Sequence, residues 1–223
     1  MKRLRPCALL LAAAVAAIPL KGAARAGTLE DIRGRGVVTC AVAENVPGIS
    51  GQAEGRRSGL AIDLCGIVAA AVLGRAEAVA FVDVKAAEGI LSLQAEEADI
   101  LLVPGPWTFS QEVNEGVLLL HPLLQRERDG AVFGPVIRQG DDIWLVALRW
   151  TIEALRRGPD TLPAEAVTLA ETQLGFAPGW NRIISSRSES YDAFLAPHAS
   201  TIEGGGWRVL PLPEGMSFRP DGP

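Results

Sequence analysis

The stretch Gly134–Leu155, GPVIRQGDDIWLVALRWTIEAL, decides how the rest of the chain can fold. A short extended run and a polar turn come before a long amphipathic segment. Apolar side chains recur there at three- and four-residue spacing and give one broad helix face: Trp144, Leu145, Leu148, Ile152 and Leu155. Asp141 or Asp142 can cap the first amides of this helix, where negative charge suits its dipole. Such a helix must pack against a large apolar surface, so the preceding segments should form a sheet.

The preceding segments alternate between apolar strands and helices. The pattern predicts strands at Val37–Val42, Val79–Val84 and Asp99–Val103, and helices at Thr28–Ile32, Leu64–Leu73, Ala86–Glu96 and Trp107–Gln111. None of the strands has a polar face, which favours a parallel sheet that is covered on both sides. The sequence therefore predicts an α/β fold, with a mostly parallel sheet flanked by helices.

Two further strands, Val117–Leu124 and Ala131–Ile137, are separated only by the six residues from Gln125 to Gly130. This is the length of a hairpin connection. Beyond the long helix, three short helical pieces are expected near Pro163–Glu171, Pro178–Ser185 and Glu189–Leu195. We expect one α/β lobe over residues 27–203, followed by a Gly/Pro-rich tail at 204–223.

The first 26 residues have the features of a secretory signal peptide. A basic start is followed by the apolar run Ala8–Leu20 and by Ala24-Arg25-Ala26, a small-x-small cleavage sequence. A membrane anchor is the alternative, but the apolar run is shorter than a spanning helix requires. No second run of spanning length follows. We therefore expect an exported, periplasmic protein that does not span the membrane.

Charge and motif content exclude several function classes. Removing residues 1–26 takes away five of the 21 basic residues and none of the 26 acidic ones, so the net charge becomes 16 − 26 = −10. A chain this acidic is a poor partner for nucleic acid or anionic membranes. No nucleotide-binding or nucleophile motif is present, and His121 and His198 have no ligand cluster at metal-binding spacing. We expect no enzyme activity, cofactor or metal.

Two cysteines, Cys40 and Cys65, remain once Cys7 has left with the signal peptide. An even pair in an oxidising compartment predicts one disulfide. Two buried free thiols are the alternative, because pairing requires a geometry that sequence does not reveal.

Nine segments, in order, resemble the periplasmic solute-binding proteins of polar amino acid ABC transporters (family 3), especially those of general L-amino acid uptake. They are TLEDIRGRGVVTCAV, VPGIS, SGLAIDLCGIVAAAVLG, VAFVDV, LSLQAEEADILLV, WTFSQE, GPVIRQGDDIWLVALRWTIEAL, LGFAPGWNRII and ESYDAFL. The resemblance implies a periplasmic-binding-protein-like fold of type II, in which two lobes close on a ligand. It also supports the Cys40–Cys65 pairing, because that branch has cysteines at matching positions.

The chain departs from this family at one connection. Family members place their whole second lobe between the strand matching Val117–Leu124 and the segment matching Gly134–Leu155, where this sequence has the short link Gln125–Gly130. We therefore expect that the second lobe is missing and that the first has been rejoined by a hairpin.

The resemblance also locates a ligand site, in altered form. The family holds the ligand carboxylate with a Thr-x-Thr-x-x-Arg run, which here reads Pro106-Trp107-Thr108-Phe109-Ser110-Gln111. Pro106 lacks the hydroxyl and Gln111 lacks the charge, while Thr108 remains but is favoured as a helix cap. Ile49 stands where an aromatic wall is expected. The candidate ligand residues are Asn45, Gly48, Ile49, Trp107, Thr108 and Gln111.

Two functions from different classes remain open. The first is a solute-binding component related to amino acid ABC transport, with an impaired or shallow site and an ABC permease as its partner. The second is a periplasmic accessory protein that binds another protein, or a second copy of itself, through the exposed lobe face near Pro104–Phe109. A saturable small-molecule signal favours the first, and co-purification with a periplasmic partner favours the second.

Overall fold

The computed structural model describes residues 27–85 and 87–211, and the predicted signal peptide lies outside these ranges. A five-stranded sheet in the order β4-β1-β5-β9-β6 forms the centre. Its strands are β1 (Val38–Ala43), β4 (Val79–Val84), β5 (Ile100–Leu102), β6 (Val117–Leu119) and β9 (Val136–Arg138). β1 pairs in parallel with β4 and β5, and β9 pairs antiparallel with β5 and β6. The predicted α/β class is confirmed, with a parallel core inside a mixed sheet.

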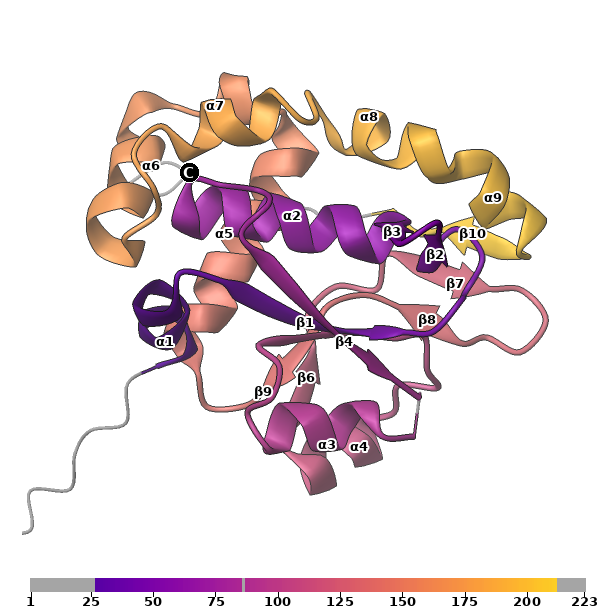
Figure 1. Ribbon diagram of the computed structural model, residues 1–223. Helices are drawn as coiled ribbons and strands as arrows, with labels where there is room; N and C mark the ends of the chain where they lie inside the picture. Colours follow the sequence, from indigo (N-terminus) through magenta and orange to yellow (C-terminus); the bar gives the residue numbers. More distant parts are fainter. Residues whose placement is uncertain (1–26, 86, 212–223) are drawn as a thin grey trace, which may run out of the picture.

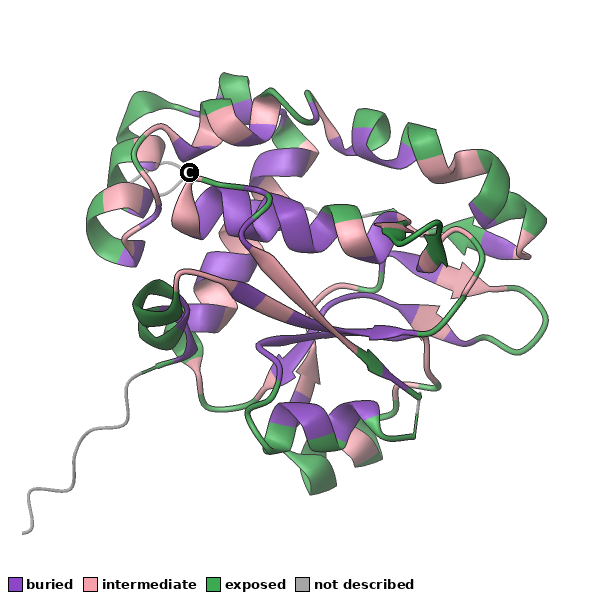
Figure 2. Cartoon of the chain, viewed as in Figure 1, coloured by how far each residue is buried: buried purple, intermediate pink, exposed green. Residues whose placement is uncertain are grey.

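Helices cover both faces of this sheet (Figure 1). On one face lie α1 (Thr28–Arg35), α2 (Leu60–Leu73) and α5 (Asp142–Arg157), and on the other lie α3 (Gly89–Gln94) and α4 (Phe109–Glu115). Side chains alternate along the strands, so Cys40 and Val42 join the core under α2 while Ala41 and Ala43 join the core under α3. Both faces of the central strands are therefore buried, as their unbroken apolar sequence predicts (Figure 2).

The two strands predicted at Val117–Leu124 and Ala131–Ile137 each break in the middle. β7 (Leu124–Arg126) and β8 (Val132–Phe133) leave the central sheet and form a second sheet with β10 (Trp207–Val209). Pro122 lies at one break and has no amide to donate to a strand ladder. Gly134 lies at the other, where a Cβ atom would stand 2.0 Å from the His121 carbonyl oxygen. The predicted hairpin at Gln125–Gly130 is present, between β7 and β8.

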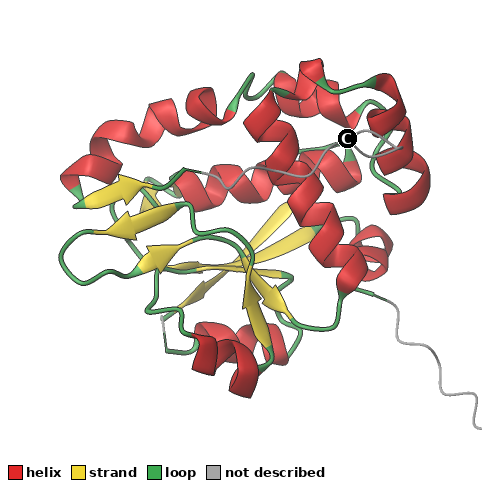
Figure 3. Ribbon diagram, turned by 180° about the vertical axis from the view of Figure 1, so that it is seen from behind, coloured by secondary structure: helices red, strands yellow, loops and turns green. Residues whose placement is uncertain are grey.

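Residues 159–204, which we call the C-terminal arm, run over the outer side of α2 (Figure 3). They comprise 3₁₀ turns at Pro159–Thr161 and Ala196–His198, a π turn at Ala170–Leu174, and the helices α6 (Ala164–Leu169), α7 (Trp180–Ser185), α8 (Tyr191–Leu195) and α9 (Ala199–Gly204). Within the arm, the Trp180 ring is fully buried in the main core. It packs edge-to-face with Phe176, at a ring-centroid distance of 4.8 Å.

The tail expected from residue 204 requires a correction. α9 extends to Gly204, and Trp207–Val209 pair with β7 as strand β10. Arg126 stacks over the Trp207 ring at 5.0 Å, so the indole is buried there. The Gly-rich run 204–206 is thus a turn between a helix and a strand, and residues 212–223 lie outside the described ranges.

One aspartate, Asp141, joins the start of helix α1 to the start of helix α5. The Asp141 Oδ1 atom accepts a hydrogen bond of 3.0 Å from the Trp144 amide, and Oδ2 accepts one of 2.8 Å from the Thr28 amide. The sequence left Asp141 and Asp142 as alternative caps, and the structure selects Asp141. Burial alone would raise the pKa of this carboxyl, but the hydrogen bonds from Thr28 and Trp144 lower it below its usual value.

Replacing Asp141 with alanine is expected to lower the free energy of unfolding by about 1 to 2 kcal/mol, because two helix starts lose their acceptor. Asp142→Ala is the matched control and should cost only a few tenths of a kcal/mol, as a dipole effect. Urea unfolding measures both. Because the folded pKa of Asp141 is lowered, its contribution should be present at neutral pH and disappear as the pH falls through that pKa. Equal losses in the two variants would contradict the assignment.

Candidate functional site

A small hollow of about 140 Å³ opens where strands β1 and β4 end. Parallel strands point their carboxyl ends to the same edge of a sheet, which is where open α/β folds bind ligands. Register places Asp83, near the end of β4, beside Val42 of β1. The lining residues are Ala43, Glu44, Asn45, Ser50, Gly51, Gln52, Arg57 and Asp83. Most of the lining is polar, so the hollow suits a hydrated or charged group.

A tight hairpin positions the cationic wall of the hollow. β2 (Gly51–Ala53) and β3 (Arg56–Ser58) pair antiparallel through a turn at Glu54 and Gly55, which have φ angles of 52° and 75°. Two successive positive φ angles are typical of the type I′ hairpin turn. The register sets Arg57 opposite Gln52, so both side chains reach the hollow.

The cation and the anion of the hollow are already paired with each other. Arg57 Nη1 lies 2.6 Å from Asp83 Oδ1, and Arg57 Nη2 lies 2.5 Å from Oδ2. This bidentate bond lowers the pKa of Asp83 and raises that of Arg57. The guanidinium also lies over the Phe81 ring, 5.4 Å from its centroid. A ligand carboxylate would have to share Arg57 with Asp83.

Of the three candidate ligand residues in the loop after β1, only Asn45 lies at the hollow. Asn45 lines the hollow, with a left-handed φ of 49°. Gly48 does not, because α9 packs on it so closely that a Cβ atom would stand 2.9 Å from the Ile202 amide nitrogen. Ile49 is fully buried in the core. A ligand in the hollow can therefore contact Asn45 but not Ile49, which is buried in the core.

The three candidate ligand residues after β5, Trp107, Thr108 and Gln111, contact other parts of the chain and not the hollow. Thr108 and Gln111 form a reciprocal capping box at the start of α4, with Thr108 accepting from the Gln111 amide and Gln111 accepting from the Thr108 amide. Trp107 is half-buried against the core under α3, and its buried indole N–H has no hydrogen-bond partner among the described residues. None of the three lines the hollow.

Sequence reasoning missed most of the lining residues. Asp83 carried a usable signal, since it is the one charged residue in an apolar strand and lies near its carboxyl end. Arg57 carried none, because its role depends on the β2–β3 register and on a partner 26 positions away.

Comparison with known proteins identifies the relatives of this fold. No family model matches the chain. The Escherichia coli protein YhdW, whose name describes an amino-acid ABC transporter-binding protein, is 36% identical over 109 residues. The general L-amino acid-binding periplasmic protein AapJ of Rhizobium johnstonii is 34% identical over 111 residues. This chain is a homologue of amino-acid-binding proteins of ABC transporters.

The similarity has a limited extent. The matches to YhdW and AapJ each cover 48% of this chain but only 32% and 33% of the relatives, so the chain spans about a third of the length of the curated relatives it matches. The glutamate/glutamine/aspartate/asparagine-binding protein BztA of Rhodobacter capsulatus is 36% identical over 95 residues. Activities of the whole relatives therefore do not transfer directly.

Solved structures support the fold. A periplasmic binding protein of Brucella ovis, solved with glutathione bound, superposes with a TM-score of 0.64 and 17% identity, over 81% of this chain and 92% of that one. Domain 1 of TmArgBP, in its arginine-bound form, gives a TM-score of 0.49 over 56% of this chain and 98% of the domain. The Brucella ovis superposition shows that the fold is that of a periplasmic binding protein.

Two structural features are absent from residues 27–85 and 87–211. No helix there is long and apolar enough to cross a membrane. No group of three or more His, Cys, Asp or Glu side chains within residues 27–85 and 87–211 is arranged to hold a metal ion.

Proposed function

We propose that the protein is a periplasmic component related to amino-acid ABC uptake that binds an amino acid, or a related small polar solute, in shallow fashion. The observation that carries this proposal is the hollow at the carboxyl ends of β1 and β4, with Asn45, Arg57 and Asp83 on its walls. Its mixed charges complement the carboxylate and ammonium groups of an amino acid. The homologues support the same class of ligand, since AapJ is named as a general L-amino acid-binding protein.

Two features of the chain support shallow binding: the small volume of the hollow, and the replacement of ligand-binding residues at positions 106 and 111. Ligand pockets usually measure about 300 to 1,000 Å³ and enclose most of a ligand, whereas this hollow measures about 140 Å³. Pro106 and Gln111 supply neither the hydroxyl nor the charge that the family motif uses, and Gln111 is engaged in the capping box. A ligand held on one side only should therefore bind weakly.

The compartment and the domain division belong to the same proposal. We infer export to the periplasm and cleavage after Ala26, because Cys40 and Cys65 form a disulfide that suits an oxidising compartment. We also infer that residues 27–203 are a single lobe rejoined at Gln125–Gly130, where family members carry their second lobe. A two-lobed closed structure from an independent determination would contradict this division.

Thermal unfolding of residues 27–223 with a panel of L-amino acids tests the binding proposal. A ligand at a hundred times its dissociation constant adds about 2.7 kcal/mol, which should raise the midpoint by about 5 to 10 °C. Arg57→Gln should remove the part of the shift that comes from the hollow, because it removes the carboxylate partner there. Arg56→Gln, in the same strand and outside the hollow, is the matched control and should keep it. If the protein unfolds cooperatively but no L-amino acid raises the midpoint, the hollow is ruled out as a binding site.

Contact with another protein is the second candidate function, and an apolar surface favours it. Phe109 and Val113, one turn apart on α4, have exposed fractions of 81% and 61%. Exposed apolar groups of this kind often mark protein contacts. A photo-crosslinker at position 109 should then give one discrete product in the periplasm of a producing cell, and one at the exposed Leu169 should not. No product at 109, or the same products at both positions, would rule this candidate out.

A further inference from the structure

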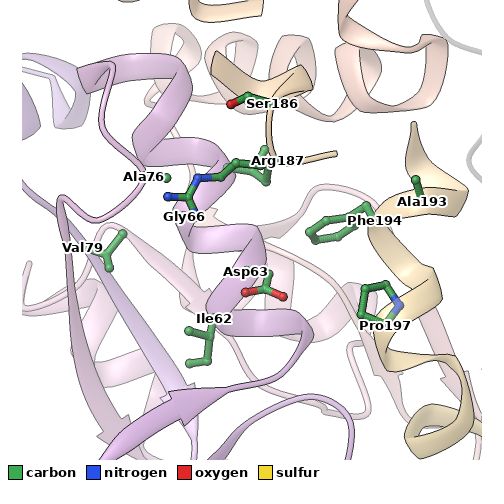
Figure 4. Close-up of a pocket in the computed structure, with 11 residues that line it drawn as sticks. Ile62, Asp63, Gly66, Ala76, Val79, Ser186, Arg187, Ala193, Phe194 and Pro197 are labelled. Carbon is green, nitrogen blue, oxygen red and sulfur yellow. The ribbon is translucent and has the colours of Figure 1, made fainter. Parts of the chain in front are cut away.

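A second and larger cavity lies between α2 and the C-terminal arm, away from the carboxyl edge (Figure 4). Its volume is about 590 Å³, within the range of small-molecule sites. It shares no lining residue with the hollow at the ends of β1 and β4. The walls come from α2, from the segment that leads into β4, and from the arm.

The cavity has a tightly packed back wall. A Cβ atom on Gly66 would stand 3.3 Å from the Ala76 carbonyl oxygen, so the absence of a side chain lets α2 approach the segment before β4. Ile67 is almost fully buried, and Phe194 on α8 is 5% exposed, with its ring directed into the cavity in Figure 4. These apolar groups can cover the hydrocarbon part of a ligand while the mouth stays open to solvent.

Two opposite charges enter the cavity from different elements. Arg187 follows α7, and its guanidinium extends from the arm towards α2 near Gly66 (Figure 4). Asp63 is in the first turn of α2, with a side chain 55% exposed, and one of its oxygens lies 2.8 Å from His198 Nε2. The other carboxylate oxygen can accept a further hydrogen bond. The cavity thus presents a cation from the arm and an anion from α2, beside the apolar side chains Ile67 and Phe194.

We propose that this cavity binds a small zwitterion with an apolar side chain, whose carboxylate contacts Arg187 and whose ammonium contacts Asp63. Arginine matches a carboxylate with two parallel donors, and an aspartate oxygen matches an ammonium donor. The inference does not depend on the proposed function of the hollow, because the two sites have different walls. The protein would then carry two small-molecule sites, one towards each end of strand β4.

Three probes that share one carbon skeleton test the assignment: L-leucine, 3-methylbutylamine without the carboxylate, and 4-methylpentanoate without the ammonium. Amide chemical shifts of Gly66 and Ser186 report binding in the purified protein. Leucine should give saturable shifts, and each truncated probe should bind about tenfold more weakly, because it loses one charged hydrogen bond.

Two charge-neutralising variants give the deciding pattern. Arg187→Gln should weaken leucine and 4-methylpentanoate about tenfold and leave 3-methylbutylamine unchanged. Asp63→Asn should weaken leucine and 3-methylbutylamine and leave 4-methylpentanoate unchanged. Arg182→Gln, an exposed arginine of the same arm outside the cavity, is the control. Unsaturable shifts at these amides, or equal effects of both variants on all three probes, would overturn the proposal. Arg57→Gln, which tests the hollow, should not alter these shifts, so the two proposals can fail separately.

Discussion

Replacing Trp144 with alanine should lower the free energy of unfolding by about 3 to 5 kcal/mol, the usual cost of removing a large aromatic side chain from a core. Trp144 is 1% exposed and lies at the start of α5, where the helix meets the sheet. Its indole Nε1 atom donates a hydrogen bond of 3.1 Å to the Asp99 carbonyl oxygen, just before β5. The substitution therefore creates a cavity and removes a buried hydrogen bond.

Urea unfolding of two variants separates this effect from a general weakening of α5. Ile143→Ala changes the neighbouring residue, which is 55% exposed, and should cost no more than about 0.5 kcal/mol. Trp144→Phe keeps most of the ring volume but not the N–H, so it should fall between the other two. An unchanged urea dependence would identify the loss as stability alone. Equal decreases in the urea midpoint for Trp144→Ala and Ile143→Ala would mean that Trp144 does not hold α5 against the sheet.

Local patterns predicted the elements better than they predicted the connections between them. The spacing in Gly134–Leu155 predicts α5 because its apolar face meets the sheet at fixed intervals. The same reasoning could not choose between Asp141 and Asp142, since the deciding contact is the Thr28 amide 113 positions away. It also missed the strand breaks near Pro122 and Gly134, which depend on two segments approaching closely.

The ligand residues were harder to predict than the fold, for a physical reason. Thr108 and Gln111 were predicted to contact a ligand, but their side chains hydrogen-bond each other's backbone amides in the capping box of α4. Ile49, also predicted to contact a ligand, is buried in the core. Arg57 and Asp83 form the hollow only through pairing of β2 with β3 and of β1 with β4. Arg187 and Asp63 line one cavity only because the arm lies over α2. Such contacts are between residues far apart in the sequence, where no periodicity reports them.

Removing the Cys40–Cys65 disulfide should lower the free energy of unfolding by about 3 to 4 kcal/mol and the melting midpoint by about 10 °C. The bond joins β1 to α2 across 25 positions, with a Cα–Cα distance of 6.5 Å and both residues fully buried. In the chain-entropy account, a cross-link restricts the unfolded chain, and this loop length corresponds to about 3.5 kcal/mol. The sequence prediction of one pairing is confirmed by this contact.

A double-mutant cycle makes the disulfide prediction specific. Cys40→Ala and Cys65→Ala each break the same bond, so each alone should cost nearly as much as the double variant. Costs that add would mean that the two residues act independently in the core. Thiol titration of the denatured, unreduced full chain should detect Cys7 alone among its three cysteines. The closed loop also carries Asn45 and Arg57, so the double variant should weaken any amino-acid binding in the hollow.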